Sequence, residues 1–243
     1  MRIAMWSGPR NISTALLRSW GNRPDTWVTD EPLYGYYLRG TGLPHPVADA
    51  VMASQPGDWQ EISERLTGPI PQGRAVWYQK HMAHHLLPEI GREWLRALEH
   101  CFLIRDPEEM LTSLLHVLPE PRLADTGLPQ QVELFEWVRE RTGRVPPVLD
   151  SRDVLENPRA QLSALCERLG LSFTERMLHW PAGTRETDGV WAPHWYASVE
   201  RSTGFEAYRP KPDQLPQRFS GLLAECRELY SALYPHCVGP SNQ

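Results

Sequence analysis

The sequence predicts an α/β fold, a three-layer arrangement in which helices flank a central parallel β-sheet. Short apolar runs of strand type alternate along the chain with longer helical patterns. Strands that are separated by crossover helices pair in parallel and are covered by helices on both faces. The chain has 243 residues, 41% of them hydrophobic and 23% charged. These values fit a folded protein that buries a core without disulfides or metals.

The first four expected strands fall in the first 104 residues. Residues 2–6 are an apolar run that ends in a Ser-Gly-Pro turn, and residues 12–20 then show helical spacing. Residues 27–30 and 75–80 combine valine with aromatic side chains, which favour strands. Residues 101–104 are consecutive apolar side chains, as in a strand that is buried on both faces.

Two helices and a fifth strand follow. Residues 108–117 are expected to be helical because Pro107 suits the first position of a helix. Residues 145–150 form the expected fifth strand, and residues 158–169 an amphipathic helix that Gly170 ends.

Three stretches are predicted to lack regular secondary structure. The segments 43–73 and 118–131 carry proline, glycine and polar residues and are interpreted as excursions or lids. Beyond Pro181 the chain is loop-like until a helical pattern at 215–233. There is no internal repeat or low-complexity tract, so residues 1–243 are treated as a single domain.

Charge and cysteine content argue against several classes of protein. The formal net charge is −5, so an anionic ligand needs a local basic pocket, and a dedicated nucleic-acid binder is disfavoured. The four cysteines are widely spaced with no CxxC pair, which argues against a zinc knuckle or a disulfide framework. The first apolar run is too short for a signal peptide or a membrane span. A cytoplasmic protein is expected, and its oligomeric state stays open.

The turn after the first strand is rich in hydrogen-bond donors. It reads Ser7-Gly8-Pro9-Arg10-Asn11-Ile12-Ser13-Thr14 and runs directly into a helix. N–H groups at a helix start point at an anion and Arg10 adds positive charge, so this loop suits a phosphate. It lacks the Gly-Lys-Ser/Thr ending of a nucleotide-triphosphate loop. The alternative is that Ser13 serves only as a helix N-cap.

A second anion site is indicated after the fourth strand. Arg105 precedes Asp106 and Pro107, and Ser113 follows about two helical turns later, so Arg105 and Ser113 could face one phosphate. The alternative is a surface ion pair, because Arg-Asp-Pro is a common start of a helix.

Together these motifs resemble the sulfotransferases that use 3′-phosphoadenosine-5′-phosphosulfate (PAPS). Residues 10–14 resemble that family's Arg/Lys-Ser-Gly-Thr-Thr loop, and residues 102–107 with Ser113 resemble its 3′-phosphate motif. Residues 150–158 and the Leu-Gly that follows resemble its strand, acidic turn, proline and helix. The resemblance covers about residues 1–172.

Two stretches are similar to a little-characterised branch of the same family. They are Met5-Trp-Ser-Gly-Pro-Arg-Asn-Ile-Ser-Thr14 and Asp30-Glu-Pro-Leu-Tyr34. Some members of that branch carry aminotransferase-like names. A pyridoxal enzyme needs a Schiff-base lysine, and neither lysine of this chain, Lys80 or Lys211, lies in such a context.

The resemblance implies a P-loop-type sandwich that moves a sulfuryl group from PAPS to a hydroxyl or amine of a small molecule, with no metal required. Arg10 would contact the bridging oxygen, and Asn11, Ser13 and Thr14 the rest of the 5′ side. Arg105 and Ser113 would hold the 3′-phosphate. Ile12 stands where the family has glycine, so Gly8 is expected to supply the turn. The basic C-terminal loop of cytosolic members is missing, and Arg201 and Ser202 are its candidate substitutes.

Two residues are candidates for the base that accepts the acceptor's proton. Glu31, followed by Pro32 and Leu33, resembles the Glu-Pro-Leu of carbohydrate sulfotransferases, and its alternative role is a helix-start or solvent-facing carboxylate. His81, directly after Lys80, partly resembles the Lys-Thr-His of the cytosolic enzymes, whose histidine is one position further on. Glu31 ranks above His81.

A metal site is disfavoured. His81, His84 and His85 have spacings that place ligands on one helical face, but no carboxylate or cysteine lies in the same stretch.

The sequence leaves open which acceptor is used and which class of reaction is catalysed. Seven aromatic residues could line an acceptor site that fits an aromatic alcohol, a sugar or an amine: Trp6, Tyr34, Tyr36, Tyr37, Trp191, Trp195 and Tyr196. The other functions that stay open are an ATP-dependent small-molecule kinase and a non-catalytic nucleotide-binding module.

Overall fold

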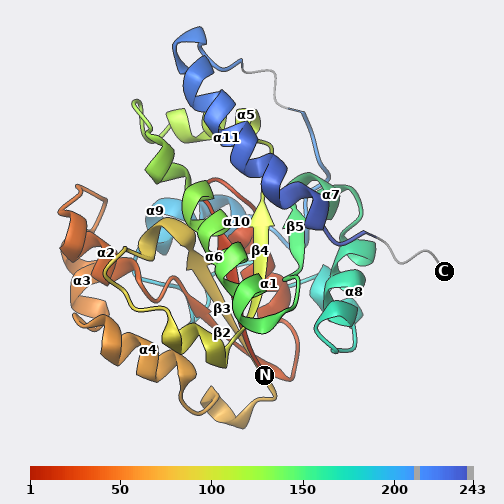
Figure 1. The fold of residues 1–243 in the computed structure, drawn as a ribbon. Helices are drawn as coiled ribbons and strands as arrows, with labels where there is room; N and C mark the ends of the chain where they lie inside the picture. The colour runs from red at the N-terminus through yellow and green to blue at the C-terminus, as the bar shows by residue number, and fades with distance from the viewer. Residues whose placement is uncertain (211–213, 240–243) are drawn as a thin grey trace.

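The centre of the protein is a five-stranded sheet, seen in a computed structural model that describes residues 1–210 and 214–239 (Figure 1). The strand order is β2-β3-β1-β4-β5, and every neighbouring pair is parallel. The strands are β1 (Arg2–Ser7), β2 (Thr26–Asp30), β3 (Val76–Met82), β4 (Glu99–Ile104) and β5 (Val148–Asp150). The predicted α/β class with a parallel sheet is confirmed.

The strands lie where the apolar runs predicted them, with small shifts at their ends. β3 continues two residues beyond the prediction because His81 and Met82 pair with Trp6 and Ser7 of β1. β5 starts three residues late, because proline has no N–H to donate to a sheet and the two residues before Val148 are prolines.

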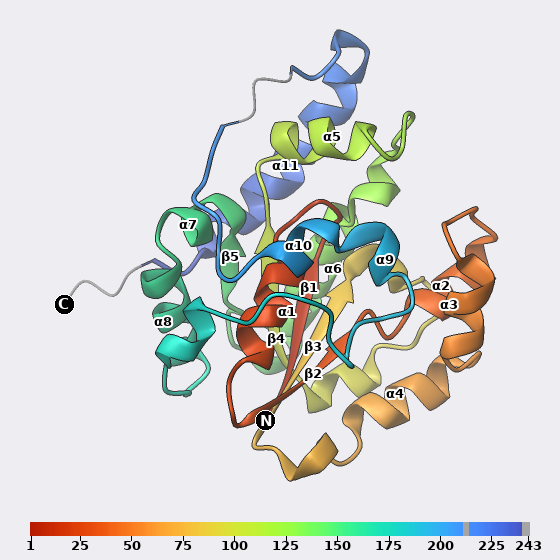
Figure 2. The same ribbon diagram turned by 180° about the vertical axis from the view of Figure 1, so that it is seen from behind.

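Helices cover both faces of the sheet. They are α1 (Ser13–Gly21), α2 (Tyr34–Thr41), α3 (Ala48–Ser54), α4 (Trp59–Thr67), α5 (Pro107–Leu115), α6 (Leu128–Thr142), α7 (Ser151–Glu156), α8 (Pro158–Arg168), α9 (Ala192–Trp195), α10 (Ala197–Arg201) and α11 (Ser220–Leu233). Side chains of α1 and α8 form one buried core, on the face toward the viewer in Figure 2, and side chains of α4 and α6 form the core on the opposite face. No helix within 1–210 or 214–239 is long and apolar enough to cross a membrane.

The two segments that were expected to be irregular, 43–73 and 118–131, contain helices that the sequence did not predict. The segment 43–73 holds α3 and α4, and the segment 118–131 leads into α6. Ile62 and Leu66 of α4 lie one helical turn apart and are buried against the sheet, so this part of the chain belongs to the core and is not a lid.

The loop after β1 packs directly against the backbone of another loop. A Cβ on Gly8 would lie 2.3 Å from the carbonyl oxygen of Thr126. We therefore expect Gly8→Ala to lower the free energy of unfolding by about 1–3 kcal/mol, measured by urea denaturation. Gly221→Ala in α11 is the matched control, since its Cβ would meet nothing within 4 Å. An unchanged midpoint for Gly8→Ala would contradict this close packing.

Candidate active site

Two clusters of polar side chains lie at the carboxyl ends of the strands, where ligands bind in open parallel sheets. The arginine cluster consists of Arg10, which follows β1, with Arg105 and Ser113, which follow β4. The carboxylate cluster consists of Asp30, the last residue of β2, Glu31, which follows it, Lys80 within β3, and Tyr196 between α9 and α10. In the sheet, β2 and β3 lie on one side of β1 and β4 on the other, so the two clusters occupy neighbouring parts of the same sheet edge.

The arginine cluster unites residues that two separate motifs predicted. Arg10 Nε donates to Ser113 Oγ at 3.1 Å, and Arg105 Nη1 donates to the carbonyl oxygen of Arg10 at 2.6 Å. Burial and the nearby charge of Arg105 lower the pKa of Arg10. Two guanidinium groups held this close favour an anion that neutralises both.

The backbone at Arg10 replaces the turn expected at Gly8. Arg10 has a φ of 58°, a left-handed conformation that is uncommon outside glycine, whereas Gly8 is not among the positive-φ residues. Gly8 is needed for its close contact with Thr126 instead. Strained backbone of this kind is often found at functional sites.

The other residues of the loop have different tasks. Asn11 Nδ2 donates to the carbonyl of Leu103 at 3.2 Å, and its Oδ1 lies 3.2 Å from Ser151 Oγ, so Asn11 ties the loop to β4 and α7. The residue that caps α1 is Ile12, so the alternative reading of Ser13 as the N-cap is wrong. Ser13 and Thr14 form the first turn of α1, and Ile12 offers no side-chain acceptor to the N–H groups of that turn.

A pocket of about 750 Å³ adjoins Arg105. Its walls include Arg152 from α7 and the segment 206–210. Glu109 lies between the two arginines, with its carboxylate 3.2 Å from Arg105 Nη2 and 2.9 Å from Arg152 Nη2. Burial opposes the charge on Glu109, but hydrogen bonds from Tyr208, Arg152 and Arg105 outweigh it and lower the pKa of this carboxyl. The arginines thus already hold one carboxylate.

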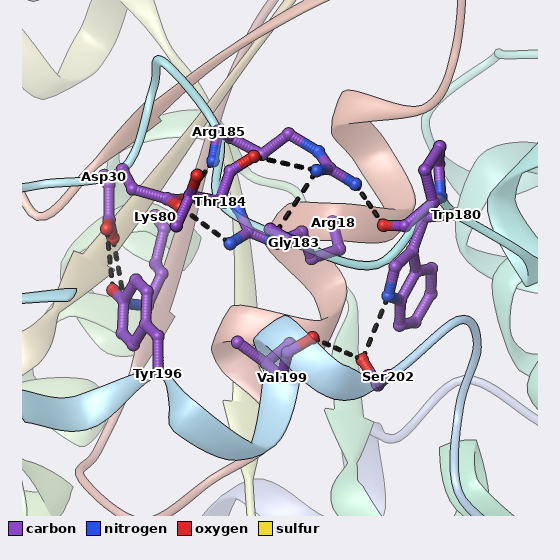
Figure 3. A network of polar contacts seen from close by, with 12 residues as sticks. Arg18, Asp30, Lys80, Trp180, Gly183, Thr184, Arg185, Tyr196, Val199 and Ser202 are labelled. Atoms are coloured by element: carbon purple, nitrogen blue, oxygen red, sulfur yellow. Dashed lines mark hydrogen bonds and ion pairs between the residues drawn. The ribbon is translucent and has the colours of Figure 1, made fainter. Parts of the chain in front are cut away.

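Arg201 and Ser202 do not line this pocket. Ser202 Oγ accepts a hydrogen bond from Trp180 Nε1 at 3.0 Å and donates to the carbonyl of Val199 at 2.7 Å (Figure 3). The C-terminal wall comes instead from Tyr208 and Arg209, which the sequence analysis missed because they lie in no motif.

The carboxylate cluster is a nearly closed set of hydrogen bonds around Lys80. Lys80 Nζ lies 2.9 Å from Asp30 Oδ1, 2.6 Å from Glu31 Oε1 and 2.8 Å from the hydroxyl of Tyr196. That hydroxyl donates to Asp30 Oδ2 at 2.6 Å (Figure 3). The side chain of Glu31 is 12% exposed, whereas those of Asp30 and Lys80 are at most 2% exposed, so Glu31 is the acid that reaches the surface.

Burial and neighbouring charges set the protonation of this cluster. Burial raises the pKa of Glu31, the charge of Lys80 opposes the rise and the charge of Asp30 adds to it. Burial disfavours a charged Lys80, but the two carboxylates outweigh it and raise the pKa of the ammonium well above its usual value. Glu31 has a φ of 38°, so the two candidate catalytic residues Arg10 and Glu31 share the left-handed conformation.

His81 lies on the opposite face of β3 from Lys80, as alternation along a strand requires. Its ring stacks on Trp6 at 4.3 Å between ring centroids and is 1% exposed. Burial and the neighbouring His100 lower the pKa of His81 to about 3. The structure therefore places Glu31 in the carboxylate cluster and His81 in the buried core on the other face of the sheet.

Most of the expected aromatic wall lies near Glu31. Tyr34, Tyr37, Trp191 and Tyr196 belong to one buried cluster, in which Tyr34 and Tyr37 both stack on His85. Trp6 is instead part of the core beneath the sheet. Within 1–210 and 214–239, no three His, Cys, Asp or Glu side chains are placed to hold a metal ion.

Comparison with known proteins gives consistent matches along the chain. A family model described as a sulfotransferase domain matches residues 1–234. The branched-chain-amino-acid aminotransferase-like proteins 1 and 2 of Arabidopsis thaliana are 34% and 32% identical to this chain over 99% of its length. The chain spans 43% and 42% of those proteins, about two fifths of their length.

Three solved structures share the fold. The sulfotransferase domain of the Synechococcus PCC 7002 olefin synthase has a TM-score of 0.61 at 17% identity, with 95% of this chain and 94% of that chain covered. A sulfotransferase from Alicyclobacillus acidocaldarius has a TM-score of 0.58 at 13% identity, with 96% and 95% covered. The sulfotransferase domain of the curacin biosynthetic pathway has a TM-score of 0.54 at 16% identity, with 96% of both chains covered.

Proposed function

Because this chain belongs to the sulfotransferase domain family, we propose that it transfers a sulfuryl group from PAPS to a hydroxyl or amine of a small molecule. The observation that carries the proposal is the arginine cluster, in which Arg10, Arg105 and Ser113 meet at the ends of β1 and β4. A donor with phosphates at both ends of its ribose needs cations in this place.

The residues around the pocket fit such a donor. Its volume of about 750 Å³ is in the range of small-molecule sites. Arg105 and Arg152 pair with the carboxylate of Glu109, so a phosphate of the donor would share these arginines with Glu109 or take its place. The N–H groups at the start of α1, with Arg10, would hold the 5′ side, and Arg105 and Ser113 the 3′-phosphate. Tyr208 and Arg209 take the place proposed from sequence for Arg201 and Ser202.

Glu31 is the proposed base. Its side chain is 12% exposed, and burial raises its pKa toward neutral pH, where a general base works best. PAPS supplies the sulfuryl group and a stable bisphosphate leaving group. In the transfer, the acceptor O–H bond breaks and its proton passes to Glu31, while the acceptor oxygen bonds to sulfur. The bond from sulfur to the bridging oxygen breaks, and Arg10 stabilises the charge that this oxygen gains.

Lys80 has no role as a Schiff-base lysine in this proposal. Amino transfer by pyridoxal phosphate requires a lysine that forms such a base, whereas Lys80 is held as an ammonium by Asp30 and Glu31. The second lysine, Lys211, lies outside the described residues. The aminotransferase-like names of the plant relatives are therefore not carried over.

Binding of the donor product is the direct test. We expect adenosine 3′,5′-bisphosphate to bind with a Kd near 1 μM, about −8 kcal/mol, and ATP with magnesium to bind far more weakly, by calorimetry at one ionic strength. Tight binding of ATP alone would overturn the proposal in favour of a kinase. Bisphosphate binding without transfer to any of a panel of phenols, sugars and amines would indicate a non-catalytic binding module.

A further inference from the structure

The hydrogen bonds within the carboxylate cluster determine which carboxylate oxygen can accept a proton. Lys80 Nζ has three hydrogens, and three acceptors surround it: Asp30 Oδ1, Glu31 Oε1 and the hydroxyl of Tyr196. Tyr196 uses its own proton on Asp30 Oδ2 and also accepts from Trp191 Nε1 at 3.2 Å. Both oxygens of Asp30 therefore have donors.

Glu31 differs from Asp30 in its second oxygen. His85 Nδ1 lies 3.9 Å from Glu31 Oε2, beyond hydrogen-bond distance. Burial and the charges of its neighbours lower the pKa of His85 well below its usual value, so this imidazole is neutral. Within residues 1–210 and 214–239, three of the four carboxylate oxygens have a donor at hydrogen-bond distance, whereas Glu31 Oε2 has none, and Glu31 is the more exposed acid.

We propose that Tyr196 is a positioning residue that occupies Asp30 Oδ2 with its own hydroxyl proton and so directs the acceptor's proton to Glu31 Oε2. This inference rests on the proposed function, because it explains which acid of an adjacent pair serves as the base. Two carboxylates and one ammonium carry a net charge of −1, so the cluster can take up one proton. With Tyr196 in place, protonation of Asp30 would break a short hydrogen bond, and protonation of Glu31 Oε2 would break none.

The C-terminal third of the chain holds Tyr196 in position. Tyr196 lies between α9 and α10, and the segment before it is fixed to α1 by the ion pair of Arg18 and Asp188. In this pair Arg18 Nη2 lies 2.8 Å from Asp188 Oδ2, and both side chains are at least 94% buried. The titratable groups near Glu31 come from β2, α2, β3, the turn after β3 and the α9–α10 junction: Asp30, Tyr34, Lys80, His85 and Tyr196.

Tyr196→Phe removes one oxygen and is the sharpest test. We expect kcat to fall roughly tenfold, the acid limb of the kcat–pH profile to move to higher pH, and both the donor KM and the Kd for the bisphosphate to stay unchanged. Tyr78→Phe is the control, because its buried hydroxyl has no hydrogen-bond partner within the described residues. An unchanged acid limb and kcat for Tyr196→Phe would overturn the proposal. So would a lower melting temperature as the sole effect.

A second measurement does not depend on activity. Carboxyl ¹³C NMR of labelled protein, assigned with Glu31→Gln and Asp30→Asn, reports which acid takes up the proton as the pH is lowered. We expect Glu31 to take it up first in the wild type, and the two acids to share it in Tyr196→Phe. Uptake at Asp30 first in the wild type would overturn the inference. If the wild type moves no sulfuryl group, the proposed function fails, while the NMR titration still decides the role of Tyr196.

Discussion

Glu31→Gln is expected to lower kcat by about 10²–10⁴-fold, the usual contribution of a general base. Glutamine keeps an oxygen that accepts from Lys80, as Glu31 Oε1 does now at 2.6 Å, so the cluster can persist while the proton acceptor is lost. The arginine cluster is separate, so the Kd for adenosine 3′,5′-bisphosphate should not change. Steady-state kinetics with the best acceptor, together with calorimetry, measures both quantities.

The pH profile gives the sign of the effect. The base works only when it is ionised, and the pKa of Glu31 is raised. Activity should therefore increase as the pH rises through this raised value and stay constant above it, and the acid limb should disappear in Glu31→Gln. Glu133→Gln is the matched control, since Glu133 is 55% exposed and pairs with Arg92 on the surface. Wild-type kcat in Glu31→Gln would remove Glu31 from the mechanism.

Arg105→Ala is expected to weaken bisphosphate binding by at least 100-fold, about 3 kcal/mol, because a charged partner of the ligand is lost from a partly buried site. Arg105 also donates to the Arg10 carbonyl, so the loop that carries Arg10 loses a support. Calorimetry with adenosine 3′,5′-bisphosphate measures the change, and thermal unfolding checks that the fold persists.

A surface arginine separates a specific contact from a general effect of charge. Arg139→Ala removes the same charge from an exposed i,i+3 pair with Glu136 and should leave binding unchanged. Arg105→Lys keeps the charge but loses the fork of donors, so its affinity should lie between those of the wild type and Arg105→Ala. Equal binding by Arg105→Ala and the wild type would refute the donor site.

The sheet and the arginine cluster could be predicted from the sequence for one physical reason. Parallel strands are buried on both faces, so their apolar runs are continuous, as in Cys101 to Ile104. Parallel strands also end at one edge, so polar residues just after them must lie near each other. Arg10 and Arg105 meet for this reason. The resemblance added their proposed roles.

Only part of the carboxylate cluster could be predicted from the sequence. Glu31 and Lys80 stood at strand ends, and alternation along β3 already implies that Lys80 and His81 face opposite sides of the sheet. Tyr196 was one of seven aromatic residues, and nothing in its spacing indicates its contact with Asp30 across 166 residues. This contact depends on how the segment after α8 folds back over α1. No local sequence pattern in that segment predicts this path.

The contact between Tyr196 and Asp30 also has a consequence for synthesis of the protein. During translation the N-terminal residues leave the ribosome first, so β1, β2 and the loop that carries Arg10 emerge long before Tyr196 does. A nascent chain that ends before residue 196 has no Tyr196 to fix the proton position at Glu31, and β1 and β2 must wait for β3, which lies between them. Tyr208 and Arg209, which line the pocket beside Arg105, are made later still, so both halves of the proposed site are complete only after residue 209 has left the ribosome.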